Sequence, residues 1–170
     1  MAVKRFLAAF NWLAVLSGII LAAAMWFPWW SLQIQYIGLT YVYPYIIRGP
    51  ATTILGYQKT SQMPLLTGLL IGCIALSLVG SVLRRWRGRI VLGVGSVLTL
   101  LAVWRFYVRA GSIASRYGMA VQGEAIATYG GFSPVHVSAK LERGFFLALI
   151  AAALCLLAAI LHARLRVRSG

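Results

Sequence analysis

The chain has 170 residues, of which 61% are hydrophobic and 11% are charged, against roughly 25% charged residues in an average soluble domain. Sixteen Lys and Arg residues oppose two acids, which gives a formal net charge of +14. This composition excludes an ordinary water-soluble fold. Because the basic residues flank apolar segments, it also favours contact with lipid headgroups over nucleic acid.

Residues 6–27 form the first predicted membrane span. The run carries no charge, and as a helix it would extend about 33 Å, enough to cross a hydrocarbon core of about 30 Å. It is longer than the apolar core of a signal peptide and ends in Trp-Phe-Pro-Trp-Trp with no small-residue cleavage site, so we expect it to be retained. Asn11 is its one strongly polar residue, and a hydrogen bond to a neighbouring helix would satisfy it.

The first outer loop, residues 28–63, shows the alternation of a β-strand. Leu32 and Ile34 alternate with glutamines, and the run ends at a glycine before a segment rich in strand-forming residues. We therefore predict a small antiparallel sheet in this loop, with Thr52–Tyr57 as a candidate third strand. Aromatic side chains suit contact with headgroups or another protein, and the candidate interface residues here are Trp29, Trp30, Tyr36, Tyr41 and Tyr43.

The second predicted span, residues 64–83, begins with Pro64, where a missing backbone donor has no cost. Gly68 and Gly72 form a GxxxG motif, which permits close approach of a second helix. Two uses stay open for this motif: packing inside one bundle, which we expect, and an interface with a second protein.

The short segment 84–89 separates the second and third spans and carries Arg84, Arg85, Arg87 and Arg89. Basic residues in short loops mark the cytoplasmic side of a membrane. The sequence therefore predicts a cytoplasmic turn at these four arginines, which determine the topology.

The third predicted span covers residues 90–109. Its uncharged part ends at Trp104 and is too short to cross alone, so we expect the helix to continue through Arg105 and Arg109. The two arginines are four residues apart and share one helix face. They are candidate lipid or anion contacts that either extend to lipid phosphates or line a polar cavity.

The second outer loop, residues 110–143, is less regular, and residues 111–127 could prolong the third helix. Glu124, His136 and Glu142 are the only grouping with metal-ligand or acid-base chemistry. Their spacing matches no metal signature. We therefore expect no enzyme activity, catalytic site, metal or cofactor. Two cysteines, Cys73 and Cys155, lie within apolar runs, which is typical of buried packing residues.

The fourth predicted span, residues 144–162, is rich in Ala and Leu and is followed by arginines. The predicted fold is an all-α membrane protein: one integral domain over residues 1–170, with a four-transmembrane-helix bundle and a small antiparallel β-sheet in the first outer loop. The basic residues are densest beside the termini and the turn at 84–89, so we expect a multi-pass protein of the cell membrane with both termini cytoplasmic.

Two regions of the chain, one after the first span and one before the fourth, resemble the claudin-like four-span family. Pro28-Trp29-Trp30-Ser31-Leu32 and Gly38-Leu39 are similar to the family's motifs after its first span, and Lys140-Leu-Glu142-Arg-Gly144 is similar to the motif that opens its fourth helix. The family's cysteine pair in the first loop is absent, and Thr40 stands where the family has tryptophan. The resemblance implies a left-handed four-helix bundle capped by an outer sheet, with lateral self-association through that sheet.

Three functions remain open from the sequence. The first is a non-enzymatic protein that associates with itself or with a membrane-protein partner through its outer loops and helix faces. The second is an accessory subunit of a larger respiratory or translocation complex. The third is a channel or carrier in which arginines attract anions, although uncharged span centres do not favour it.

Overall fold

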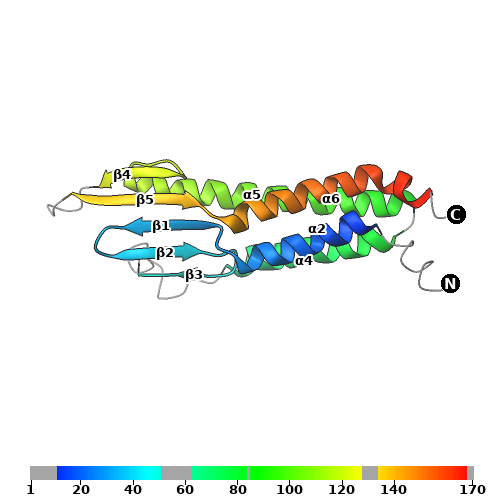
Figure 1. Ribbon diagram of the computed structural model, residues 1–170, viewed down its shortest axis with the longest axis horizontal. Coiled ribbons are helices and arrows are strands. Elements are labelled where there is room, and N and C mark those ends of the chain that lie inside the picture. Colours follow the sequence, from blue (N-terminus) through cyan, green and yellow to red (C-terminus); the bar gives the residue numbers. More distant parts are fainter. Residues whose placement is uncertain (1–10, 51–62, 84, 128–133, 168–170) are drawn as a thin grey trace. The chain divides into compact units, whose positions relative to one another are not determined.

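The computed structural model describes residues 11–50, 63–83, 85–127 and 134–167 (Figure 1). These residues form two compact units, each described by itself. The helical unit takes its described residues from within 1–23, 68–102 and 147–170, and the sheet unit takes its described residues from within 24–67 and 103–146.

Four α-helices form in the described residues: α2 (Trp12–Trp26), α4 (Pro64–Val82), α5 (Arg85–Ala114) and α6 (Arg143–Val167). Three of them, α4, α5 and α6, are long and apolar enough to cross a membrane. The 15-residue α2 is shorter, extending about 22 Å. Asn11 precedes its first helical residue, so the prediction of an unbroken helix over residues 6–27 is wrong at this point; residues 6–10 lie outside the described part of the chain.

The predicted turn at residues 84–89 is also wrong in its extent. Arg85 is the first residue of α5, so Arg87 and Arg89 are helical as well. Arginine is a good helix former, which fits a helix that already begins at Arg85; the chain bends before it, at Leu83. Arg84 lies outside the described residues. The predicted continuation of this helix through Arg105 and Arg109 is confirmed.

The helical unit is held by polar side chains that donate to main-chain carbonyls of neighbouring helices. Ser17 of α2 donates to the Ala151 carbonyl of α6 at 2.8 Å, and Ser96 of α5 donates to the next carbonyl, that of Ala152, at 3.0 Å. The Cys155 thiol of α6 donates to the Leu92 carbonyl of α5 at 3.3 Å. Ala151 and Ala152 are buried, and small residues of this kind let helix backbones approach closely.

The sheet unit contains five antiparallel strands in the order β3-β2-β1-β5-β4 (Figure 1). The strands are β1 (Trp30–Ile34), β2 (Gly38–Val42), β3 (Ile47–Arg48), β4 (Gly123–Ala127) and β5 (Val135–Leu141). The prediction of a sheet from the first outer loop alone is incomplete, because β4 and β5 come from the second loop. The candidate strand Thr52–Tyr57 lies outside the described residues.

Residues 111–127 could prolong the third helix by sequence, and α5 does extend into them, but only as far as Ala114. After α5 the chain forms a 3₁₀ turn, η1 (Ser115–Tyr117), and Gly118 then adopts a left-handed conformation with φ of 73°. This conformation is the common end of a helix, and the chain continues into β4.

Gly144 allows the start of α6 to lie against the segment that leads into β1. Its amide donates to the Pro28 carbonyl at 3.0 Å. A Cβ at this position would lie 2.6 Å from the Phe27 carbonyl oxygen and 2.6 Å from the Trp29 ring. Both neighbours are held by backbone or by burial, so the position has no room for a side chain.

We therefore expect Gly144→Ala to destabilise the protein by about 1–3 kcal/mol through overpacking. The matched control is Gly93→Ala, because no described atom lies within 4 Å of a Cβ placed on Gly93 and alanine favours helices by about 1 kcal/mol over glycine. Thermal unfolding in mild detergent measures both. Equal stability of the two variants would contradict the packing described for Gly144.

Candidate functional site

The two tryptophans predicted at an interface are interior residues of the sheet unit. Trp29 and Trp30 are both 0% exposed. The Trp29 indole donates to the Ala24 carbonyl at 2.9 Å and packs edge-on against Phe106 of α5, and the Trp30 indole donates to the Val121 carbonyl at 2.8 Å. Their side chains therefore stabilise the unit, and the prediction that they contact a partner is wrong.

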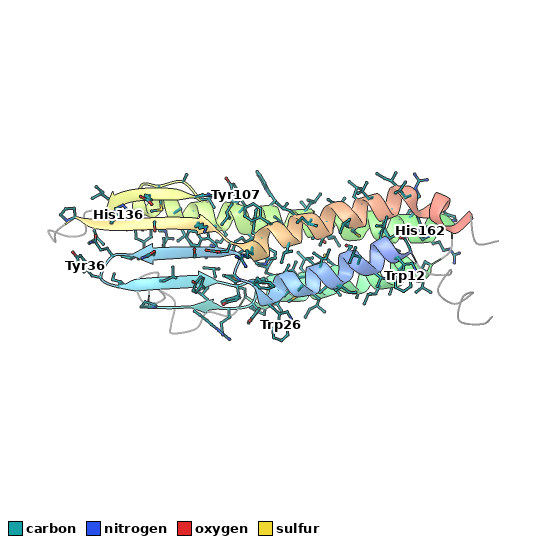
Figure 2. The ribbon with its side chains drawn as sticks, viewed as in Figure 1. Trp12, Trp26, Tyr36, Tyr107, His136 and His162 are labelled. Atoms are coloured by element: carbon teal, nitrogen blue, oxygen red, sulfur yellow. The ribbon has the colours of Figure 1, made fainter. Side chains whose placement is uncertain are left out.

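The three tyrosines predicted at an interface differ from the tryptophans. Tyr36, in the turn between β1 and β2, is 89% exposed (Figure 2). Its φ of 67° is in the left-handed region that bulky residues rarely adopt. Tyr41 is also exposed, and Tyr43 is half-buried against Tyr45. The positive φ belongs to the tight turn between β1 and β2, and this turn leaves the Tyr36 ring on the surface.

Helix α4 has two opposite faces. Its buried face carries Ser77 and Gly80, and a Cβ on Gly80 would lie 2.7 Å from Leu92 of α5. Gly68 and Gly72 lie on the exposed face, and no described atom lies within 4 Å of a Cβ placed on either. The GxxxG motif is therefore not used for packing within the described helical unit.

The exposed glycines belong to a longer stripe of small and β-branched residues. Positions along α4 spaced by three and four residues share one helix face, and at this spacing all are exposed. We call this stripe the α4 glycine face; its residues in the helical unit are Gly68, Gly72, Ala75, Val79 and Val82.

Arg105 and Arg109 line a cavity of about 370 Å³ within the sheet unit. The cavity is otherwise apolar, which differs from the polar cavity that the sequence left open. Its remaining lining residues come from β1, β2, the start of α4 and the last turns of α5; they are Trp30, Val42, Met63, Pro64, Leu65, Leu66, Phe106, Ala110 and Ile113. No motif in the sequence indicated this cavity, because it is formed by segments distant in the chain.

Of the three residues considered for metal or acid-base chemistry, the structure brings two together and places the third elsewhere. His136 and Glu124 lie on the neighbouring strands β5 and β4, with 3.4 Å between Nε2 and Oε2, and both side chains are more than half exposed. Glu142 instead accepts a hydrogen bond from the Ser31 hydroxyl at 2.8 Å. The described residues hold no group of three or more metal-ligating side chains.

His162 of α6, labelled in Figure 2, is buried in the helical unit and belongs to a polar network. The Asn11 amide donates to the Ala158 carbonyl at 3.0 Å and lies 3.1 Å from His162 Nδ1, while His162 Nε2 lies 3.1 Å from the Leu83 carbonyl. The carbonyl can only accept, so Nε2 carries the proton and Nδ1 accepts from Asn11. A Cβ on Gly88 would lie 2.6 Å from His162 Nε2, so this glycine makes room for the ring.

The expected hydrogen bond of Asn11 to a neighbouring helix is thus confirmed. The Asn11 side-chain oxygen also lies 3.4 Å from the Ala14 amide, and its backbone carbonyl accepts from the same amide at 3.0 Å. Asn11 therefore caps the start of α2. Within the described residues, no buried side-chain nitrogen or oxygen lacks a hydrogen-bond partner.

Comparison with known proteins gives no assignment: no protein-family model matches the chain, and no curated protein matches it.

The two histidines of the chain offer a matched test of the network. His162→Leu would remove a donor and an acceptor from a buried cluster, and we expect a loss of about 1–3 kcal/mol in the free energy of unfolding. His136→Leu, at an exposed position, is expected to change it by less than about 0.5 kcal/mol. Thermal unfolding in detergent compares them, and a His162 variant as stable as the His136 variant would show that the network contributes nothing.

Proposed function

We propose that this chain is a non-enzymatic, multi-pass protein of the cell membrane that associates laterally with copies of itself through the α4 glycine face. The membrane location is supported by α5. Trp86 and Trp104 are both about two-thirds exposed, and at 18 residues apart they are separated by about 27 Å along the helix axis, close to the thickness of a hydrocarbon core. Tryptophan is enriched at both membrane interfaces.

The surface of α5 between these tryptophans also supports a lipid environment. Ile90, Val97 and Leu101 are each more than half exposed, and such a continuous apolar face would be costly in water. We propose that α4, α5 and α6 cross the bilayer with the arginines at 84–89 on the cytoplasmic side. The shorter α2 crosses if the bilayer thins around it, which leaves both termini cytoplasmic.

The observation that carries the association is the open space over Gly68 and Gly72. A helix face that only meets lipid gains nothing from glycine, whereas glycine at this spacing permits a second helix backbone to come close. Of the three long helices, α4 is also the least covered: 28% of its most apolar stretch is buried, against 39% for α5 and 44% for α6. Packing within the helical unit therefore does not explain why the α4 glycine face carries small residues.

The exposed tyrosines of the sheet unit provide a second contact surface under the same proposal. Tyr36 and Tyr41 are amphipathic side chains suited to another protein or to headgroups. Lateral association through an outer sheet is also what the resemblance to claudin-like proteins implies. A different protein on the same surfaces would make the chain an accessory subunit of a larger complex.

Disulfide crosslinking in native membranes tests the proposal. In a background with Cys73 and Cys155 replaced by serine, we expect Ala75→Cys to form a crosslinked dimer on oxidation. Val97→Cys, which is also at an exposed position but lies on α5, is the matched control and is expected to stay monomeric. Adding Gly72→Leu to the Ala75→Cys variant should reduce the dimer about tenfold or more, the factor that 1.4 kcal/mol represents.

Gly93→Leu is the control for that last step, because Gly93 also has open space but lies outside the α4 glycine face. It is expected to leave the Ala75→Cys dimer unchanged. A crosslink of Ala75→Cys to a different protein would favour the accessory subunit. If Ala75→Cys and Val97→Cys crosslink to the same extent, the proposal is wrong.

A further inference from the structure

The cavity of the sheet unit has two kinds of chemistry on one wall. Arg105 and Arg109 leave the same face of α5 one helical turn apart. Phe106 and Ala110, which follow them in sequence, are only 5% and 3% exposed and form an apolar floor beside the arginines. All four residues line the same cavity of about 370 Å³.

The charge on this wall selects an anion. Each guanidinium group presents a planar set of donors that matches a phosphate or carboxylate. The chain has only two acids, and neither lines the cavity: Glu124 contacts His136, and Glu142 accepts from Ser31. The described lining of the cavity therefore contains two guanidinium groups and no carboxylate.

The apolar walls of the cavity favour an anion that also carries an apolar chain. Besides the residues of α5, the cavity is lined by Trp30 of β1, by Met63 just before α4 and by Leu66 in the first turn of α4. A small hydrated anion gains nothing from such walls, whereas a lipid carries an anionic group and an apolar chain in one molecule. The volume is at the lower end of the range of about 300–1,000 Å³ for ligand pockets, so the cavity has room for the part of a lipid nearest its headgroup.

We propose that this cavity binds a phospholipid with a net negative headgroup. The phosphate lies against Arg105 and Arg109, and the beginning of an acyl chain lies against Phe106 and Leu66. The site relies on the proposed membrane location for its supply of lipid. It shares no residue with the α4 glycine face, so its test is separate from the test of association.

Native mass spectrometry of the full-length protein in mild detergent tests this site, with phosphatidylglycerol as the anionic probe and phosphatidylcholine as the zwitterionic one. We expect phosphatidylglycerol to bind more tightly than phosphatidylcholine. Arg105→Gln combined with Arg109→Gln should weaken phosphatidylglycerol binding by about tenfold or more. Arg116→Gln removes one charge from an exposed residue of η1 outside the cavity, and is expected to bind as the parent does.

Two further measurements separate binding of the acyl chain from binding of the anionic group alone. Ala110→Leu fills the floor without changing charge and should also weaken phosphatidylglycerol binding, while inorganic phosphate in excess should not displace the lipid. An equal loss of phosphatidylglycerol binding in the Arg116 variant would show a general effect of charge. Displacement by phosphate would show that the cavity binds anions without binding the acyl chain. Either result overturns the proposal.

A measurement on the unmodified protein covers the case in which the double arginine variant does not fold. A phosphatidylglycerol carrying a photoreactive group near the start of its acyl chain should crosslink to peptides that contain Leu66 or Phe106. Crosslinks confined to other peptides would overturn the assignment of this cavity as the binding site.

Discussion

The helical unit depends on hydrogen bonds from the side chains of neighbouring helices to the main-chain carbonyls of α6. Ser17, Ser96 and Asn11 donate to three of these carbonyls, two of them adjacent in sequence. The acceptors belong to alanines whose small side chains leave the backbone within reach. A polar group in this position must find its partner inside the protein if the surroundings are hydrocarbon, so the same contacts that join the helices also make the unit compatible with a bilayer.

The sequence contained most of what determines the long helices and much less of what determines the sheet. Residues 64–83 were predicted as a span, and α4 runs from Pro64 to Val82, because an uncharged apolar run bounded by proline and arginine has few alternatives. The strand β5 also had a readable signal, since Val135, Val137, Ala139 and Leu141 alternate with polar residues. The five residues of β4 are rich in glycine and alanine, and only pairing with β5 makes them a strand.

The types of residue at the candidate sites could be predicted from the sequence, but their positions in the structure could not. Tryptophans after a predicted span are typical of a membrane interface, but Trp29 and Trp30 are buried, and Trp29 packs against Phe106 of α5 and Phe145 of α6. The pairing of Arg105 with Arg109 followed from helical spacing, whereas the apolar cavity beside them needs residues from β1, β2 and the start of α4. The orientation of Gly68 and Gly72 could not be read from the motif, since GxxxG serves internal and external packing alike.

The most direct test of the proposal that the helical unit lies in a membrane is cysteine accessibility in cells. In the background without Cys73 and Cys155, single cysteines are placed at Tyr36, Arg87 and Val97 and treated with a membrane-impermeant maleimide. The account predicts labelling at position 36 in intact cells, at position 87 only after the membrane is opened, and at position 97 in neither case. Labelling at position 97 as fast as at position 36, or a protein that remains in solution without detergent, would contradict it.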